Sequence, residues 1–395
     1  MNILFITYFQ VVPVRGGIGR VTDVLARELR IGYGHKCHSL YIAETDPAVR
    51  NPNMDSECHC PSLTEGEVCE AVRRVEADVI ISQELNTHSE AIRGGVDASG
   101  RRCKVVYAHH STPMAHEKAF LGFGCMLGEY RRKPSVKGFA RLAGYPLYRF
   151  IKLRGFRRCF RRTGETSDAV VLLSDRFVPL WLETSGTGSD DAGRISAIPN
   201  PVSFDTYAVR EEICRKERRL LVVSRMSEIH KRTMMVLEAW REIQDDAVAE
   251  GWQLDIVGDG DDLDAYKDYA SKHLERVNFY GQQPPRKYYD RASVFLMTSR
   301  FEGWGLTLTE AGQSGCAVVA VDSYLSLRDI IIDGENGLLV PEGDFKAFIA
   351  AIKRLMADKT LRENMGLRGV ELAGRFSGQN VAAKWNRLFN KLMDS

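Results

Sequence analysis

Ten short apolar segments, separated along the whole chain by helix-like patterns, constrain the fold more than any other feature of this sequence. Each is of strand length and continuously apolar, as in strands that are buried on both faces. Helical patterns such as 233–244 and 345–356 lie between many of them, and this alternation is typical of parallel α/β sheets. The segments are NILFITY, DVIIS, KVVYAH, AVVLLS, RLLVVS, QLDIVG, VNFYG, SVFLMTS, AVVAVD and NGLLVP.

The length of 395 residues favours two domains, because single cores stop growing well below that size. The strand series pauses at SAIPNPVSFD, residues 196–205, where Asn-Pro chemistry breaks regular structure, and the charged run REEICRKERR follows. We therefore predict an α/β protein of two doubly wound, Rossmann-like domains, residues 1–205 and 206–377. The closing segment, 378–395, contains an amphipathic helix that we expect to pack back onto the first domain.

Composition excludes several other classes of protein. A hydrophobic content of 44% and a charged content of 27% describe a soluble globular chain. No run of about 18 apolar residues could form a membrane-spanning helix, and MNILFITYFQ lacks the basic leader and cleavage site of a secretion signal. Nine cysteines without framework spacing suit a reducing cytosol, so we expect a cytoplasmic protein. No second ligand pair follows Cys58-His59-Cys60 at zinc spacing, so we expect no metal there.

The first candidate ligand-binding feature is the glycine loop VRGGIGRV. Doubly wound sheets bind ligands at the carboxyl ends of their strands, and the first strand ends near Tyr8. Gly16, Gly17 and Gly19 then precede or open a helix, where free N–H groups and the positive end of the helix dipole suit a phosphate. The spacing differs from the dinucleotide fingerprint G-x-G-x-x-G. A tight turn explains these glycines equally well.

The second domain opens with a basic pair after a strand. Arg225 follows the strand end of VVSRMSEIHKR and Lys231 comes six residues later, an arrangement that suits a diphosphate. Solvated loop charges are the alternative explanation. Gly258 and Gly260, in IVGDGDDLDAY, allow close backbone approach after the next strand.

Two carboxylates frame the stretch SRFEGWGLTLTE. Thr307 and Glu310 match the S/T-x-x-E form of a capping box, and Glu302 could be an exposed loop acid. These local explanations leave Gly303-Trp304-Gly305 unexplained. A loop of free N–H groups and carboxylates beside a basic pair fits a phosphorylated, hydroxyl-rich ligand, because carboxylates accept hydrogen bonds from sugar hydroxyls.

The segments EGWGLTLTE and AGQSGCAVVAVD together resemble the E-x7-E motif of the large family of retaining GT-B glycosyltransferases. The glycine loop, Arg225, Lys231, GDG, YGQQP and DIIIDGENGLLVPEGD agree with that family in order and spacing. The resemblance covers nearly all of the second domain and little of the first. It implies two Rossmann-like domains that face each other across a cleft.

The resemblance also implies roles for individual residues. Arg225 and Lys231 would hold the donor diphosphate and stabilise the departing nucleotide. Glu310 would accept hydrogen bonds from the ribose, and Glu302 would contact the donor sugar. These contacts would be completed by backbone N–H groups of Gly303, Trp304 and Gly305, and by Gly16, Gly17 and Gly258 beside the phosphates or the acceptor. The family more often has Phe at the position of Trp304.

Family members carry a histidine after a first-domain strand, close to the transferred sugar. VVYAHHSTP offers His109 and His110, and strand spacing favours His110. An ordinary loop imidazole is the alternative for either residue.

The reaction that the resemblance implies is transfer of a sugar from a nucleotide diphosphate sugar to an acceptor hydroxyl, with the anomeric configuration retained. It requires no metal or other cofactor, and Asp259 and Asp261 lie on the glycine loop already described. Cell-surface polysaccharide or glycolipid assembly is the expected setting. The sequence does not indicate the donor base, the sugar, the acceptor, the linkage or the oligomeric state.

Residues 131–162 contain no acidic residue, and aromatic and aliphatic side chains are interleaved there with Arg and Lys. Basic amphipathic segments of this kind bind anionic membrane surfaces. Nucleic acid binding and a solvated helical face are alternatives. We expect peripheral membrane contact, a sugar or lipid-linked acceptor, and no nucleic acid.

Two other classes of function fit the same features. A nucleotide-sugar epimerase can share the fold, and a non-catalytic sugar-nucleotide binding protein can share the pocket. A dehydrogenase fits least, because the glycine loop lacks the dinucleotide spacing.

Overall fold

The chain forms two compact units in the computed structural model, which describes residues 1–12, 16–44, 46 and 48–395. Unit 1 combines Met1–Pro199 with Val381–Ser395, and unit 2 is Asn200–Asn380. The chain therefore leaves unit 1 within SAIPNP and returns to it near the start of the last helix. The expected boundaries, 205/206 and 377/378, lie a few residues from these positions.

Unit 1 is built on a seven-stranded parallel sheet in the order β3-β2-β1-β4-β5-β6-β7. The direction of winding reverses between β1 and β4, and such switch points are where doubly wound sheets bind ligands. The strands are β1 (Asn2–Phe9), β2 (Lys36–Ala43), β3 (Ser56–His59), β4 (Val79–Gln83), β5 (Lys104–His109), β6 (Ala169–Leu172) and β7 (Ile195–Ala197).

Helices cover both faces of this sheet, as β1 shows. Ile3 and Phe5 pack in one apolar cluster with Leu25 of α1 (Gly17–Tyr33). Leu4 and Ile6 point to the opposite face and join a second cluster. That second cluster includes residues of α2 (Glu65–Val75) and α3 (Ser89–Ser99). Successive side chains of a strand alternate between faces, so continuous apolarity in β1 reflects two buried faces.

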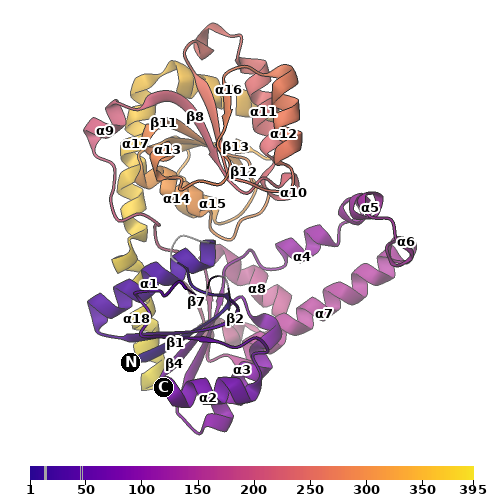
Figure 1. Cartoon of the computed structure of the whole chain (residues 1–395), viewed down its shortest axis with the longest axis vertical. Coiled ribbons are helices and arrows are strands. Elements are labelled where there is room, and N and C mark those ends of the chain that lie inside the picture. The colour runs from indigo at the N-terminus through magenta and orange to yellow at the C-terminus, as the bar shows by residue number, and fades with distance from the viewer. Residues whose placement is uncertain (13–15, 45, 47) are drawn as a thin grey trace. The chain divides into compact units, whose positions relative to one another are not determined.

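The last helix, α18 (Gly378–Asp394), completes the core of unit 1 (Figure 1). Val381, Trp385, Phe389 and Leu392 belong to the same cluster as Ile3. His35 Nε2 also lies 2.8 Å from Asn386 Oδ1. The amphipathic pattern of this helix thus corresponds to one buried face.

Between β5 and β6 the chain forms a helical arm, which we define as α4–α7, residues 115–166. Figure 1 shows it projecting from the rest of unit 1. The C-terminal end of α7 is anchored, because Phe160 and Thr163 are fully buried. Its helices are α4 (Ala115–Phe120), α5 (Phe123–Arg132), α6 (Val136–Ala143) and α7 (Tyr145–Thr166); α8 (Val178–Ser185) follows after β6.

Unit 2 has a six-stranded parallel sheet in the order β10-β9-β8-β11-β12-β13, with its switch point between β8 and β11. The strands are β8 (Glu217–Val223), β9 (Gln253–Val257), β10 (Val277–Phe279), β11 (Ala292–Met297), β12 (Ala317–Asp322) and β13 (Gly337–Pro341). The helices are α9 (Arg210–Cys214), α10 (Glu228–Lys231), α11 (Thr233–Ile243), α12 (Leu263–His273), α13 (Arg286–Arg291), α14 (Leu306–Gln313), α15 (Leu327–Ile330), α16 (Phe345–Ala357) and α17 (Lys359–Ala373).

A large apolar cluster under α11, α12 and α16 holds unit 2 together. Leu220 and Val222 of β8 meet Trp240 and Phe348 there, and all four side chains are at most 4% exposed. Burying a large apolar side chain contributes about 1.5–3 kcal/mol. The sheet is therefore a rigid base for the loops at the carboxyl ends of its strands.

Candidate active site

In unit 1, the glycine loop leads into the first turn of α1. Gly16 is the N-cap with φ of 71°, and Gly17 is the first helical residue; both are exposed. A Cβ on Gly16 would contact nothing within 4 Å, so its backbone conformation and not its packing favours glycine. The first turn carries no acidic side chain. Arg15 of the predicted loop lies outside the described residues.

The two candidate histidines occupy different environments at the end of β5. His109 is 2% exposed, and its ring lies against the aromatic rings of Tyr107, Phe160 and Trp181. His110 is half-buried, and its Nε2 lies 2.9 Å from Gln83 Oε1. Of the two, His110 is the one that combines a hydrogen-bonded ring with accessible surface, and its contact with a ligand remains a prediction.

Two residues that the sequence analysis did not single out, Gln83 and Glu84, hold this histidine. Gln83 ends β4 and exchanges hydrogen bonds with Thr22 of α1 at 2.7 and 3.0 Å. Glu84 Oε1 accepts the backbone N–H of His110 at 2.5 Å and lies 3.3 Å from His109 Nδ1. The sequence signal that could have identified Glu84 is its position directly after the predicted strand DVIIS and Gln83, at a strand end.

Glu84 combines backbone strain with a perturbed carboxylate. Its φ of 58° is unusual for a residue with a Cβ. Burial alone would raise the pKa of Glu84, but the imidazoles of His109 and His110 and the His110 backbone N–H lower it below its usual range. The carboxylate is therefore charged at neutral pH. Strained non-glycine residues with perturbed pKa values cluster at functional sites.

In unit 2, the loop after β8 lies directly on the glycine loop after β9. The Met226 N–H donates to the Asp259 carbonyl at 2.9 Å, and the Asp262 N–H donates to the Met226 carbonyl at 3.2 Å. Gly258 has φ of 137°, and a Cβ there would lie 1.8 Å from the Ser224 carbonyl oxygen. The close approach that Gly258 permits is thus between these two loops. Its predicted contact with a donor remains a prediction.

Arg225 projects from this loop pair as an exposed side chain. No ion pair or hydrogen bond joins it to any residue that the structure describes. Lys231, by contrast, ends α10 and forms an ion pair with Glu302, the two side chains being 20% and 17% exposed. The loops after β8 and β11 therefore bring Lys231 and Glu302 together, as the strand-end rule predicts.

The motif Gly303-Trp304-Gly305 is shaped by packing within unit 2. Trp304 is 3% exposed and meets the Phe376 ring edge-on, with centroids 5.0 Å apart. Gly305 caps α14 with φ of 92°, and a Cβ there would lie 2.9 Å from the Tyr324 hydroxyl oxygen. The indole is thus a core anchor, and only the backbone of this motif is available to a ligand.

Glu310 lies inside α14 and is 0% exposed. The Tyr289 hydroxyl donates to its Oε2 at 3.1 Å. The capping-box explanation is wrong, because α14 begins at Leu306 with Gly305 as N-cap and no side-chain cap. A ribose contact through Glu310 requires a rearrangement that uncovers its carboxylate, and this contact remains a prediction.

The described part of the chain contains no group of three or more His, Cys, Asp and Glu side chains placed to hold a metal ion. At the Cys58-His59-Cys60 segment the two sulfur atoms lie 3.9 Å apart. His59 Nε2 lies instead 3.0 Å from the Ile42 carbonyl.

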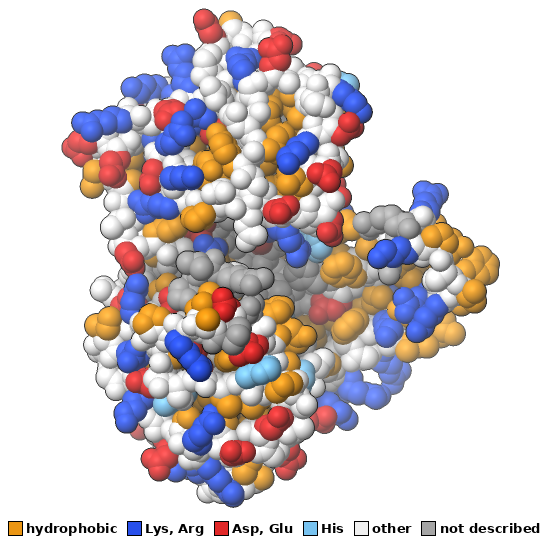
Figure 2. All heavy atoms as spheres, in the orientation of Figure 1, with side chains coloured by type: hydrophobic (Ala, Val, Ile, Leu, Met, Phe, Trp, Pro, Cys, Tyr) orange, Lys and Arg blue, Asp and Glu red, His pale blue; other side chains and the backbone are white. Residues whose placement is uncertain are grey.

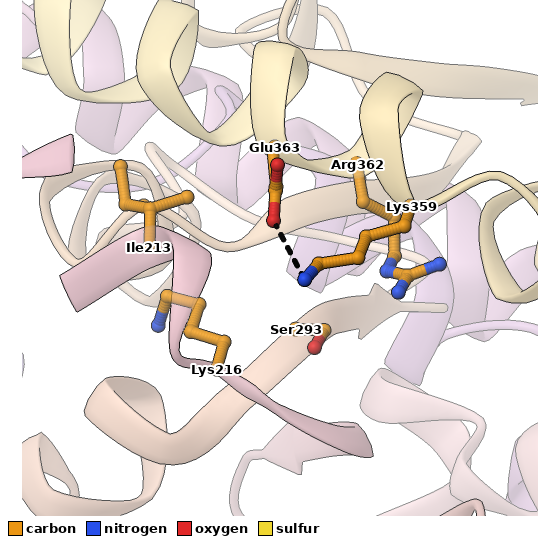
Figure 3. A pocket seen from close by; sticks show the side chains of 7 residues that line it. Ile213, Lys216, Ser293, Lys359, Arg362 and Glu363 are labelled. Atoms are coloured by element: carbon orange, nitrogen blue, oxygen red, sulfur yellow. Dashed lines mark ion pairs between the residues drawn. The ribbon is translucent and has the colours of Figure 1, made fainter. Parts of the chain in front are cut away.

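A small basic pocket elsewhere in unit 2 is already satisfied internally (Figure 3). Lys216 Nζ donates to the Tyr289 carbonyl at 2.6 Å, Lys359 lies 3.5 Å from Glu363, and Arg362 donates to the Leu355 carbonyl at 2.6 Å. These cations serve the fold of unit 2.

Comparison with known proteins identifies the segment that carries most of these features. Residues 204–371 match the model of the family described as "Glycosyl transferases group 1". This segment, which is less than half of the chain, resembles the group 1 glycosyl transferases. It contains Arg225, Lys231, Glu302 and Glu310.

Curated relatives match about half of this chain. An exopolysaccharide phosphotransferase of Streptomyces coelicolor is 31% identical over 57% of this chain and 24% of its own length. The amylovoran biosynthesis glycosyltransferase AmsD of Erwinia amylovora is 30% identical over 50% of this chain and 55% of its own length. The matches thus span between about a quarter and about half of these relatives.

Anabaena HepE, solved in complex with UDP-glucose, has a TM-score of 0.74 at 15% identity and covers 99% of this chain and 100% of its own. This likeness shows the GT-B fold for this chain. It confirms the predicted fold class of two doubly wound α/β domains. In the described residues, every helix is too short or too polar to cross a membrane.

Proposed function

We propose that this chain is a group 1 glycosyl transferase and a retaining hexosyltransferase, which moves a sugar from a nucleotide diphosphate sugar to an acceptor hydroxyl. The observation that carries the proposal is the position of Arg225 and of the Lys231–Glu302 pair on strand-end loops of the segment that matches the family. Because HepE was solved with UDP-glucose, UDP-sugars are the first donors to test.

The donor diphosphate would be held by Arg225 and Lys231. Arg225 is exposed and makes no ion pair with any described residue, so its guanidinium would bind phosphate without breaking an existing ion pair. Lys231 would interact with both Glu302 and the phosphates. Fixed cations of this kind stabilise the negative charge that grows on the departing nucleotide. Glu302 would then accept hydrogen bonds from the donor sugar, and the backbone of residues 303–305 would donate to it.

Retention is ascribed to attack from the same face as the departing phosphate, which assists deprotonation of the acceptor hydroxyl. This assignment gives Glu302 and Glu310 no nucleophilic role, and it needs no metal ion or other cofactor. Burial of Glu310 supports excluding it from the anomeric carbon. For His110, held by Gln83 and Glu84, we keep the role beside the transferred sugar.

Cell-surface polysaccharide or glycolipid assembly is the setting that we propose, with a sugar or lipid-linked acceptor. The amylovoran relative supports a polysaccharide product. Residues 131–162 would hold the chain on the inner, cytoplasmic face of an anionic membrane, since they carry exposed apolar and basic side chains and no acid. Vesicle co-sedimentation that is indifferent to anionic lipid would contradict this contact.

Thermal-shift measurements with a panel of nucleotide sugars test the donor site. The true donor should raise the melting temperature by mass action, and the Arg225→Ala variant should lose that response. NMR of the product anomer, with and without acceptor, then separates transfer with retention from epimerisation, which needs no acceptor. A panel in which no nucleotide sugar shifts the melting temperature contradicts the proposal.

A further inference from the structure

The helical arm of unit 1 exposes apolar side chains to an unusual extent. Seven of the thirteen large apolar side chains that are exposed among the described residues lie in the arm. Figure 2 shows hydrophobic and basic side chains side by side on it. They are Phe120, Phe123, Val136, Phe139, Leu147, Phe150 and Ile151. Concentrated exposed apolar surface marks an interaction site.

The arm also contains a pocket of about 260 Å³ between α4, α5, α6 and α7. Lys133, Lys137 and Arg141 line one part of it, and Phe120 and Met126 line another. None of its described lining residues is acidic, and none of these three cations is paired with a carboxylate in the described part of the chain. Arg141 instead lies over the Tyr148 ring, 5.6 Å from its centroid.

Three cations around one cavity favour an anion, because none of them pairs with a carboxylate among the described residues. Lys and Arg donors suit phosphate oxygens in particular. The volume lies just below the range of about 300–1,000 Å³ for sites that enclose a drug-sized ligand, so it fits a headgroup and not a whole glycolipid. The apolar part of the lining and the exposed Phe120 would then contact the attached hydrocarbon.

We propose that this pocket binds the phosphate headgroup of an anionic membrane lipid, which deepens the membrane contact of the proposed function and rests on it. The pocket gives that contact a defined subsite where the composition of residues 131–162 gives only general attraction. The arm begins at Ala115, five residues after His110. A lipid-linked acceptor would therefore meet the same segment of unit 1 that carries the candidate histidine.

Isothermal titration calorimetry of the whole chain tests the pocket. Dihexanoyl phosphatidic acid, kept below its critical micelle concentration, should bind, and dihexanoyl phosphatidylcholine should not, because its headgroup carries no net negative charge. Inorganic phosphate tests whether the pocket prefers a lipid or a free anion. It should bind at least tenfold more weakly than dihexanoyl phosphatidic acid, since it lacks the hydrocarbon chains. Equal affinity for inorganic phosphate, or no binding of phosphatidic acid, overturns the proposal.

Matched charge variants test the location. The triple variant Lys133→Gln/Lys137→Gln/Arg141→Gln should weaken phosphatidic acid binding on the order of a hundredfold, since each basic residue near an anionic headgroup contributes a factor of about five. The control Arg154→Gln/Arg157→Gln/Arg158→Gln removes the same charge from exposed positions of α7 outside the pocket lining. It should weaken binding less than threefold. Equal losses in the two variants overturn the pocket.

Two further measurements keep the outcomes separate. If circular dichroism shows that the pocket triple variant has lost helix, the single variant Lys137→Gln replaces it, because Lys137 is exposed. This variant should weaken phosphatidic acid binding about fivefold. Donor turnover is measured in parallel on a soluble acceptor. If the wild-type chain turns over the donor but does not bind phosphatidic acid, only the pocket proposal is contradicted. If it binds phosphatidic acid but shows no turnover, only the transferase proposal is contradicted.

Discussion

Arg225 and Lys231 follow the same strand, but they differ in what the protein loses when each is removed. Arg225 is exposed and makes no ion pair with any described residue, whereas Lys231 neutralises the half-buried Glu302. Loss of function and loss of stability can therefore be separated at these two positions.

We expect Arg225→Ala to lower kcat/KM for the donor by about 10²–10³-fold, the scale of a lost electrostatic contact in the transition state. Its melting temperature should stay close to that of the wild type, since exposed substitutions change stability by less than about 0.5 kcal/mol. Steady-state kinetics and thermal unfolding measure the two effects. An unchanged kcat/KM would remove Arg225 from the donor site.

Lys231→Ala should lower activity by a similar factor and also destabilise unit 2 by about 1–3 kcal/mol, because the half-buried Glu302 carboxylate loses its ion pair with the Lys231 ammonium. The double variant Lys231→Ala/Glu302→Gln should recover stability without recovering activity. Recovery of both properties would show that the pair is only structural.

At Glu310 we expect Glu310→Gln to weaken nucleotide binding at least tenfold while changing the melting temperature little, since an amide still accepts from the Tyr289 hydroxyl. The control Tyr289→Phe removes that hydrogen bond, at about 1 kcal/mol, and keeps the carboxylate. Calorimetric titration with UDP and thermal unfolding measure both variants. A lowered melting temperature with unchanged UDP binding would assign Glu310 a structural role alone.

At the scale of elements, the loops after β8 and β9 stabilise each other because their backbones are in direct contact. Gly258→Ala places a Cβ 1.8 Å from the Ser224 carbonyl oxygen at a φ of 137°. We expect it to lower the free energy of unfolding by about 3 kcal/mol or more. Gly16→Ala is the control, with φ of 71° but no atom within 4 Å, and should cost about 1 kcal/mol. Urea unfolding measures both; equal costs would contradict direct contact between the loops.

All six strands of unit 2, including its edge strands β10 and β13, were predictable from sequence, whereas β2, β3 and β7 of unit 1 were not. β1, β4, β8 and β11 each contain a run of apolar residues that is buried on both faces of the sheet. β2 was missed because His38 and Ser39 interrupt its apolar run, and their burial depends on tertiary partners. β3 and β7 are short and half-buried, so their sequences carry little pattern.

The candidate site was predictable in position and not in detail. Parallel topology brings strand ends to one edge of each sheet, which is why Lys231 and Glu302 could be grouped in advance. The left-handed backbone of Glu84, the burial of Trp304 and the Tyr289–Glu310 hydrogen bond depend on packing between distant segments. Local sequence patterns carry no information about such contacts.

At the scale of the whole molecule, the attachment of α18 to unit 1 should depend on pH. His35 is 8% exposed and contacts Asn386, and burial lowers the pKa of His35 in the folded state, partly offset by the Asn386 hydrogen bond. The unfolded chain, with a histidine pKa of about 6.5, then binds a proton more readily than the folded chain. This contribution to stability is present above about pH 6.5 and is lost as the pH falls toward the folded pKa.

We expect the free energy of unfolding of unit 1 to decline below about pH 6.5, and His35→Gln to flatten part of that decline. His38, whose pKa burial also lowers, provides the matched comparison through His38→Gln. Urea unfolding at pH 5 to 8 gives the profile. If His35→Gln leaves the profile unchanged, the pH dependence does not arise at α18.

Because α18 completes the core of unit 1, the order of synthesis on the ribosome has a consequence for folding. The 181 residues of unit 2 (380 − 200 + 1) must be translated before Val381, Trp385 and Phe389 emerge. At about 5–20 residues per second this delay lasts roughly 10–40 s. During that interval an apolar face of the unit 1 sheet stays uncovered, while unit 2 can already fold. We therefore expect the nascent chain to need chaperones more for unit 1 than for unit 2.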